Sequence, residues 1–555
     1  MNMLKSIFKT VTVFISLSMM PGIAVTAHAA FQTVHNDFFW YDTSGNSIQT
    51  RSGCIRKFNN LYYWYGMQNG SNQNCYTSAD LIHWVYKGIV LTTPGISCDR
   101  MDVLYCDSTK QYVMFLKYDT DIAYLGIATC ATPDGQFVFK GSSLVQGAKI
   151  GDMSMYEDDD KKAYLAYVWD SAGTNAQHAV ALMSGDYLTV EKRIYLWNRG
   201  GREAPHIFKR HGVYYYGTSQ TDWVASTATE YYTATNLAGP WSSPTTLSTP
   251  GSTDSWETQC DFVFPFYGPN DTVYMYDGDR WTKTPWAQGD YPWLPLTFNG
   301  TVPTMNYYED WDIDINAGTW RPFDLSRNLA LHKTATASSV SGANAASNVT
   351  DSAFYLTYIN YRWESAASDP QWIMVDLGAP TNINRVILKW HSDYAKAFQI
   401  QTSTNSTTWT DVYSTTKGGS WSVTDVAFNT ASARYVRMYG TQRGTANGYS
   451  LFNFMVLNDS LSTPTTFKAE KSPVPVASKT ILNCQNNAIH YFIAKNGSVK
   501  LEMFDAMGKI KAVLVDGFQN RGNHGASLPG KLGKGIYVLR LTLDGETHVI
   551  YYGVP

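Results

Sequence analysis

Five polar residues stand at matching places in the first 320 residues, each 11 to 15 positions before the start of a tyrosine-rich run. They are Arg51, Asp99, Asp152, Glu203 and Gln259. Three are carboxylates, and a pair of carboxyl groups can serve as general acid and general base. Glycoside hydrolysis needs such a set, with one carboxyl held protonated and a base on the other face of the sugar. The alternative is a wet, ion-paired channel without catalysis.

The tyrosine-rich runs predict the scaffold that positions these residues. Their leading tyrosines are residues 62, 112, 164, 214 and 274, with gaps of 50, 52, 50 and 60. Each run alternates and is rich in β-formers, as expected of a half-buried strand. A period near 50 is typical of propeller blades, so we expect a five-bladed β-propeller over residues 31–322. The first strand of each blade would line the channel, so the five polar side chains would converge on its axis.

The composition favours strands and excludes two classes of protein. The chain has 555 residues, of which 14% are aromatic and 16% charged. A disordered chain has few aromatic residues and a high net charge. A formal charge of −3 argues against a nucleic-acid partner, which requires a basic face. We therefore expect an all-β, folded protein.

The N-terminus is typical of an export signal over residues 1–29. Lys5 and Lys9 precede an apolar run from Val11 to Val25, and Ala27-His28-Ala29 gives a small-x-small cleavage pattern. The alternative is a membrane anchor, but the run is shorter than the ~20 residues needed to span a bilayer. Seven cysteines are interpreted as structural, and their odd number leaves at least one thiol unpaired.

Two further domains are predicted after the propeller. Residues 324–459 contain short alternating strands such as 372–378 and 433–440, which indicate a β-sandwich. Residues 460–478 are rich in Ser, Thr, Pro and Lys and are interpreted as a linker. Residues 479–555 alternate again, notably at 497–505 and 535–541, and predict a small Ig-like β-sandwich.

Three segments make residues 31–320 resemble glycoside hydrolase family 43, a family of five-bladed propellers. Gly201–Arg210 resembles the family's general-acid strand, Asp152–Tyr156 the strand of the aspartate that tunes the acid, and Tyr62–Gly66 the first blade. Thr258-Gln259, Tyr276–Trp281 and Trp293–Leu296 resemble the exo-β-1,3-galactanase branch. That resemblance implies an enzyme acting on plant arabinogalactan.

The resemblance also implies roles for the axial residues. Glu203 would be the general acid, Asp152 its tuner and orienter, and Gln259 the base-position residue, acting through its imidic acid form. Asp99 falls where the branch carries a glutamate before arginine. The mechanism implied is inversion, with Glu203 protonating the glycosidic oxygen while a water held by Gln259 attacks. No cofactor is expected for catalysis.

The chain departs from the branch in its first blade, where Thr50-Arg51-Ser52-Gly53 replaces a His-Gly-Gly run. Arg51 could bind a sugar hydroxyl, neutralise Asp99, or fill the −1 subsite and abolish activity. Tryptophans are candidate sugar platforms, with packing between blades as the alternative for each: Trp64, Trp223 and Trp281, together with Trp256 and Trp286.

The later domains resemble known accessory units. Residues 324–459 resemble the discoidin fold, whose bacterial members include carbohydrate-binding modules of family 32. The resemblance leaves a structural calcium near Asp351 open, because Asn453 stands where relatives carry a glutamate ligand. Loop residues that could meet a sugar are Trp363, His391, Tyr394 and Arg443. Residues 479–555 resemble type IX secretion sorting domains, which implies export across the outer membrane of a Gram-negative bacterium.

Three functions are consistent with the sequence. The first is a secreted or cell-surface, monomeric exo-galactanase whose partners are a galactose-containing polysaccharide and the outer-membrane secretion machinery. The second is a family 43 enzyme of another specificity, an α-L-arabinofuranosidase or β-xylosidase. The third is a glycan-binding propeller that Arg51 has made inactive.

Overall fold

The structure is a computed structural model. It describes residues 31–119, 123–169, 177–198, 200–222, 226–268, 272–281, 290–351, 361–459 and, with short gaps, 481–554. The expected export signal and linker lie outside these residues, as do Trp223 and Trp286. Among the described residues, no helix is long and apolar enough to cross a membrane.

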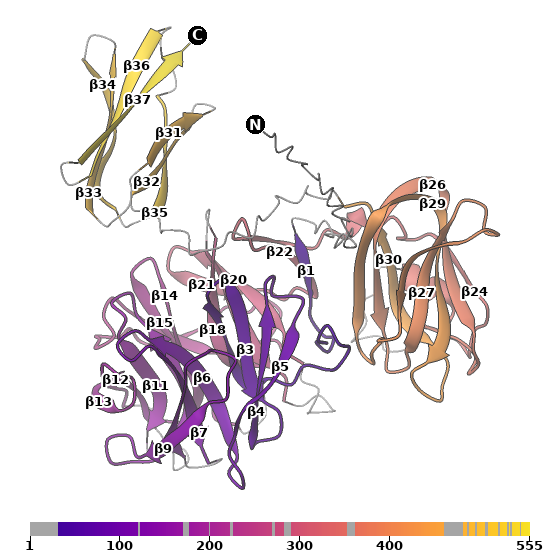
Figure 1. Ribbon diagram of the computed structural model, residues 1–555, viewed down its shortest axis with the longest axis horizontal. Coiled ribbons are helices and arrows are strands. Elements are labelled where there is room, and N and C mark those ends of the chain that lie inside the picture. Colours follow the sequence, from indigo (N-terminus) through magenta and orange to yellow (C-terminus); the bar gives the residue numbers. More distant parts are fainter. Residues whose placement is uncertain are drawn as a thin grey trace, which may run out of the picture.

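The first domain consists of four-stranded antiparallel sheets, five of them within the described residues (Figure 1). The first sheet contains β2 (Arg51–Phe58), β3 (Leu61–Met67), β4 (Asn72–Ser78) and β5 (Val85–Thr92). The second contains β6 (Cys98–Cys106), β7 (Gln111–Tyr118), β8 (Tyr124–Cys130) and β9 (Val138–Ser143). The third contains β10 (Ile150–Glu157), β11 (Ala163–Trp169), β12 (Gln177–Met183) and β13 (Val190–Leu196). The fourth contains β14 (Arg202–Arg210), β15 (Val213–Gln220), β16 (Glu230–Ala234) and β17 (Thr245–Thr246). The fifth contains β18 (Gln259–Tyr267), β19 (Thr272–Asp279), β20 (Trp293–Asn299) and β21 (Val302–Met305).

The inner strands of these sheets form a closed cycle. β2 contacts β6, β6 contacts β10, β10 contacts β14, β14 contacts β18, and β18 contacts β2. Each tyrosine-rich run forms the second strand of a sheet and pairs with the inner strand before it. This arrangement is consistent with the predicted propeller, and it brings the starts of the inner strands around one axis.

A tryptophan cluster joins the first sheet to the fifth. The Trp64 ring lies 5.1 Å from that of Trp293 and 5.2 Å from that of Trp84, and Trp40 lies 4.3 Å from Trp293. All four side chains are buried. Aromatic pairs at these distances add to the free energy gained from burial, so the cluster stabilises the closure of the cycle.

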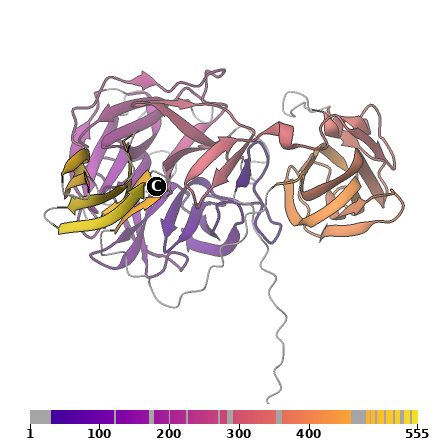
Figure 2. The same cartoon turned by 90° about the horizontal axis from the view of Figure 1, so that it is seen from above.

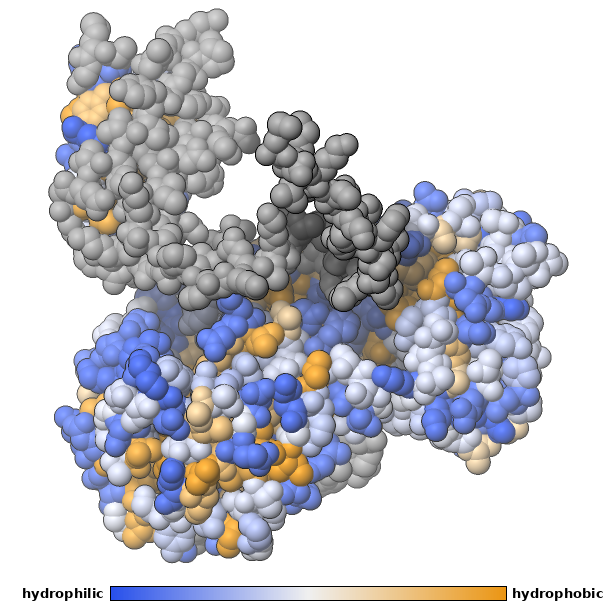
Figure 3. Space-filling model, viewed as in Figure 1, coloured by the Kyte–Doolittle hydropathy of each residue, from blue (hydrophilic) through white to orange (hydrophobic). Residues whose placement is uncertain are grey.

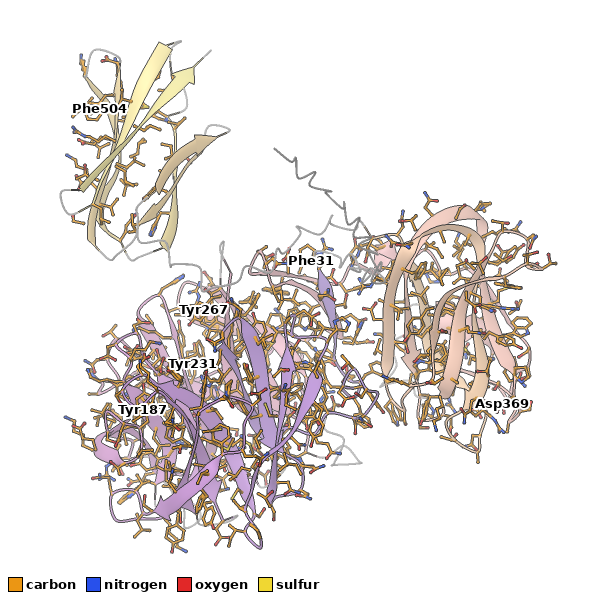
Figure 4. The ribbon with its side chains drawn as sticks, viewed as in Figure 1. Phe31, Tyr187, Tyr231, Tyr267, Asp369 and Phe504 are labelled. Atoms are coloured by element: carbon orange, nitrogen blue, oxygen red, sulfur yellow. The ribbon has the colours of Figure 1, made fainter. Side chains whose placement is uncertain are left out.

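A small bridging sheet connects the first domain to the second. It contains β1 (Gln32–His35), β22 (Asp310–Asp314) and β23 (Thr319–Pro322), in the order β1-β22-β23. β1 therefore pairs with a strand that follows the fifth sheet. Phe31 lies at this end of the domain (Figure 4), and the guanidinium of Arg321 lies 3.9 Å from its ring centroid. A 3-10 helix, η3 (Leu325–Arg327), leads to the second domain.

The second domain is a β-sandwich-like unit that lies to one side of the first (Figure 2). Its elements are β24 (Thr334–Ala337), η4 (Ala346–Thr350), β25 (Trp363–Glu364), β26 (Gln371–Trp390), β27 (Ala395–Ser403), β28 (Thr410–Thr415), β29 (Val423–Arg443) and β30 (Ser450–Leu457). The long strands β26 and β29 pair with each other and shift register between Asp376 and Thr381. One core of aliphatic and aromatic side chains fills the unit.

Buried ionic contacts hold the two domains together. Lys389 on β26 is 0% exposed and donates to Glu309 at 2.5 Å and to Asp310 at 2.6 Å. His35 lies 2.6 Å from Asp310 through Nδ1 and 3.2 Å from Asp425 through Nε2. These five residues form what we call the junction cluster.

On the face seen in Figure 3, hydrophobic and hydrophilic residues are interspersed over both domains.

The C-terminal segment forms two antiparallel sheets. One contains β31 (Ile481–Gln485), β32 (Ala488–Ile493) and β35 (Gly522–Ser527). The other contains β33 (Gly497–Asp505), β34 (Ile510–Gln519), β36 (Gly535–Leu543) and β37 (Glu546–Val554). Alternating residues such as Val499, Leu501 and Leu539 are buried in a common core.

Candidate active site

Each inner strand has a β-bulge at its predicted site residue or, in the fifth sheet, just after it. The register shifts between Arg51 and Cys54, Asp99 and Asp102, Ile150 and Met153, Glu203 and His206, and Cys260 and Phe262. The residue after the site residue has a left-handed φ in three sheets, 50° at Ser52, 48° at Arg100 and 52° at Ala204. Because a bulge re-aims the side chains around it, the same local distortion presents a polar residue from each sheet.

Gln259 contacts both Glu203, the predicted acid, and Arg100, to which the sequence analysis assigned no role. Its Nε2 donates to Oε1 of Glu203 at 2.5 Å, and its Oε1 accepts from Nη2 of Arg100 at 2.5 Å. Gln259 is 3% exposed, so both contacts are shielded from bulk water. Arg100 therefore fixes which end of the amide faces Glu203. Since Oε1 of Glu203 accepts this bond, its acidic proton is placed on Oε2.

The environment of Glu203 suits a general acid. Burial, followed by the negative charge of Asp152, raises the pKa of Glu203 from 4.5 to about 7, while Arg100 and the bond from Gln259 oppose this rise. A catalytic acid works best when its pKa lies near the operating pH. Glu203 can therefore hold its proton near neutral pH and still give it up.

Asp152 is an ionised carboxylate that lies between two cations. Its Oδ1 accepts from Lys117 at 3.1 Å, and its Oδ2 accepts from the backbone N–H of Ala204 at 3.1 Å. Arg100 lies 3.2 Å from the same Oδ2. Burial alone would raise the pKa of Asp152, but Arg100 and Lys117 outweigh burial and hold it well below its usual range. Asp152 thus supplies the charge that tunes Glu203 and fixes the bulge beside it.

Asp99 lies opposite Lys117 in the β6–β7 pair, and their Oδ1 and Nζ atoms are 3.6 Å apart. The sequence left open that Arg51 neutralises Asp99, and the structure gives this contact to Lys117. Burial raises the pKa of Asp99, and the neighbouring Asp152 adds to the rise. Lys117 was missed because it lies inside a tyrosine-rich run. The pairing of that run with the inner strand could have identified Lys117, because it sets Lys117 opposite Asp99.

Arg51 lies against the fifth sheet. Its guanidinium carbon is 5.1 Å from the centroid of the Trp281 ring, a cation–π contact. The next residue, Ser52, donates its backbone N–H to Asp279 at 3.0 Å. The predicted sugar-binding pair Arg51 and Trp281 therefore lies together. Asp279 in turn pairs with Gln259 across β18 and β19.

Trp64 does not lie at the site. It is 0% exposed within the tryptophan cluster, so it has no free ring face for a sugar and is placed in packing. Trp256 is partly buried against Tyr307, with ring centroids 5.4 Å apart. Trp223 and Trp286 lie outside the described residues.

Asp261 and Asp279 form a second acidic pair, which was not predicted from the sequence. Asp261, two residues after Gln259, accepts from Nη1 of Arg100 at 2.7 Å. Burial and the neighbouring Asp279 raise the pKa of Asp261 well above its usual range. Arg100 thus contacts three acidic or amide side chains, Gln259, Asp261 and Asp152, which come from the fifth and third sheets.

The predicted sugar contacts and calcium of the second domain have different outcomes. Trp363 was expected in a loop, but it lies in β25, is 0% exposed and cannot meet a sugar. Arg443 lies 3.4 Å from Asp369, at the end of the domain marked in Figure 4. Within the described residues, no three His, Cys, Asp or Glu side chains form a group that could hold a metal. The calcium near Asp351 and Asn453 stays a prediction.

Comparisons with known families place these observations in a class. Residues 51–262 match the model of glycosyl hydrolases family 43, and residues 348–438 match that of the NedA-like, galactose-binding domain. The first domain is thus similar to glycosyl hydrolases of family 43, and the second is similar to the discoidin-like F5/F8 type C group.

Three individual proteins are similar to parts of this chain. A β-D-galactofuranosidase of Aspergillus niger is 26% identical over 215 residues, which are 34% of this chain and 62% of the relative. The chain therefore spans less than two thirds of that relative. The exo-β-1,3-galactanase of Phanerochaete chrysosporium, solved with galactose, has 24% identity and a TM-score of 0.51. The exo-β-1,3-galactanase of Clostridium thermocellum has 23% identity and a TM-score of 0.50. Both alignments cover 77% of this chain and all of the solved chain, and they show a shared fold.

Proposed function

We propose that this protein is an exo-β-1,3-galactanase that acts on plant arabinogalactan with inversion of the anomeric carbon. The observation that carries the proposal is that Glu203, Asp152 and Gln259 meet on one axis and that burial and Asp152 raise the pKa of Glu203 to about 7. Glu203 and Gln259 are in direct contact in the free protein, so a galactosyl residue must enter between them before a water can attack the face opposite the acid. The fold shared with two exo-β-1,3-galactanases supports the choice of sugar and linkage.

The mechanism gives one role each to Glu203, Gln259 and Asp152. Oε2 of Glu203 delivers a proton to the glycosidic oxygen as the bond to the anomeric carbon breaks. In the imidic acid form implied by the family resemblance, the second hydrogen of Nε2 has moved to Oε1, and Nε2 presents a lone pair to the attacking water instead. Nε2 accepts the water's proton as the oxygen attacks, and Oε1 releases its own proton to solvent, which restores the amide. The charge of Asp152 keeps Glu203 protonated until the leaving oxygen takes its proton.

The test is incubation with β-1,3-galactan, with proton NMR of the first anomer released. We expect galactose in the α configuration, which reports cleavage, linkage and inversion together. Release of the β anomer would contradict inversion. Binding of galactan without any product, in the wild type and in Arg51→His alike, would instead establish a glycan-binding propeller.

A second specificity is favoured by one comparison. The relative from Aspergillus niger is a β-D-galactofuranosidase, so β-D-galactofuranosides belong in the substrate panel. α-L-Arabinofuranosides and β-xylosides complete it, because the family resemblance includes both activities. Faster cleavage of any of these than of β-1,3-galactan would replace the proposed substrate.

The domain organisation and location are part of the proposal. We infer that each of the five sheets is one blade of a propeller over residues 31–322, and that residues 324–459 bind carbohydrate. Residues 1–29 would direct export, and residues 479–555 would form an Ig-like sorting domain for release from a Gram-negative cell. The enzyme would act outside that cell as a monomer. Retention inside cells after deletion of residues 479–555 is the expected result.

A further inference from the structure

Lys117 is a buried cation in the centre of the site. It lies near the end of β7, is 8% exposed, and places its Nζ 3.1 Å from Asp152 and 3.6 Å from Asp99. The two carboxylates come from different sheets, the third and the second. One ammonium group therefore contacts two negative charges that face each other across the boundary between two sheets.

The charges around Lys117 account for its burial. A buried ammonium is costly unless it is paired and hydrogen-bonded. Asp152 has a second cation nearby, Arg100 at 3.2 Å. Among the ion pairs of the described residues, Asp99 contacts Lys117 alone. Removing the Lys117 charge would thus leave Asp99 and Asp152 to share one cation, Arg100, whose ion pair is with Asp152.

We propose that Lys117 is a positioning residue, the shared counter-ion that holds Asp99 and Asp152 as one fixed pair beside Glu203. Only the expected effect of Lys117 on catalysis rests on the proposed function. Lys117 acts on Glu203 through Asp152, because Oδ2 of Asp152 accepts from the N–H of Ala204, the residue after Glu203. Loss of the ammonium would loosen this anchor and misplace the acid.

The first test does not require turnover. The carboxyl carbons of Asp99 and Asp152 are titrated by 13C NMR in free protein, with Asp99→Asn and Asp152→Asn to assign the signals. In Lys117→Met, the pKa at which the Asp99–Asp152 pair takes up one proton should rise by at least about one unit. This rise corresponds to about tenfold tighter binding of that proton than in the wild type. In Lys117→Arg, the titration should stay close to that of the wild type. Titrations in Lys117→Met that match the wild type would overturn the proposal.

The second test measures coupling with Asp99. Lys117→Met should lower kcat/KM on β-1,3-galactan about 10²-fold, the usual effect of a misplaced catalytic group. In an Asp99→Asn background the same change should cost less than about tenfold, because the repulsion is already gone. Equal losses in both backgrounds would point to a direct sugar contact of Lys117 and contradict the proposal.

Control variants distinguish the loss of this particular ammonium from a general loss of charge or of folding. Lys110→Met removes an exposed lysine before the same strand, whose pair with Asp107 lies on the surface, and should change neither titration nor kcat/KM. Thermal melting shows whether Lys117→Met is folded, and Lys117→Arg keeps the proposal testable if it is not. If the wild type cleaves no galactan, the NMR titration still decides the role of Lys117.

Discussion

The guanidinium of Arg100 and the side-chain oxygen of Gln259 lie 2.5 Å apart, although they come from the second and the fifth sheets. Arg100 has a left-handed φ of 48° at a bulge, which turns its side chain toward the fifth sheet. The side-chain amide of Gln259, which comes from the fifth sheet, is therefore oriented by the second sheet. The charged groups that contact Gln259, Glu203 and Asp152 determine what each substitution at this site should do.

Glu203→Gln should abolish most activity without unfolding the protein. Glutamine keeps the shape of the side chain but has no acidic proton, so kcat should fall by about 10²- to 10⁴-fold, the usual contribution of general acid catalysis. Initial rates on β-1,3-galactan and a melting curve check both parts. Glu191→Gln, at an exposed glutamate of β13, is the matched control. Near wild-type rates in Glu203→Gln would remove it from the role of acid.

The pH dependence should report the pKa of Glu203. The protonated form is the active one, so kcat/KM should fall as pH rises through about 7. Asp152→Asn removes the like charge that raises the pKa, so the alkaline limb should move to lower pH. Full pH profiles of both proteins measure this shift. An unmoved or alkaline-shifted limb in Asp152→Asn would show that Asp152 does not tune Glu203.

Arg100→Met should release the amide of Gln259. Without the guanidinium, the amide can flip and present its oxygen to Glu203, and Asp261 and Asp152 lose a counter-ion. We expect kcat to fall by at least about 10²-fold, the usual effect of misplacing a catalytic group. Arg100→Lys keeps the charge but not the two-armed geometry, so it should recover only part of the loss. Full activity in Arg100→Lys would mean that charge alone matters.

Lys389→Met should destabilise the protein through the junction cluster. It leaves Glu309 buried without its cation and Asp310 with His35 alone, and breaking a buried pair in this way costs about 3–5 kcal/mol. The free energy of unfolding from urea denaturation is the measurement. Lys396→Met, at an exposed lysine of β27 in the same domain, should change it by less than about 0.5 kcal/mol. Equal effects of the two changes would contradict the buried role of Lys389.

The same junction should weaken as pH rises. Burial lowers the pKa of His35, but Asp310 and Asp425 outweigh it and raise the pKa above 6.5. A raised pKa means that folding favours the charged imidazole, so this stabilisation is complete below pH 6.5 and is lost above it as His35 deprotonates. Against the wild type, His35→Gln should remove the part of the stability that is lost as pH rises above 6.5. Parallel stability curves for the two proteins would show that His35 is not charged in the fold.

Much of the fold could be predicted from the sequence because the tyrosine-rich runs repeat. Equivalent positions in a repeat face one axis, and the structure brings Glu203, Asp152 and Gln259 together as that reasoning expected. Lys117 and Asp261 were not predicted because their partners depend on strand register and on neighbouring sheets. Trp64 was misplaced because alternation cannot tell an aromatic residue that packs between sheets from one that faces a sugar.

The bridging sheet has a consequence for how such proteins can evolve. β1 pairs with β22, and the junction cluster contains residues of both domains. The second domain is therefore not an independent unit joined only by a linker. Recombination near residue 323 would leave buried carboxylates on one fragment and a buried lysine on the other. The first and second domains should therefore be inherited together, with substitutions on one side of the junction accompanied by compensating ones on the other.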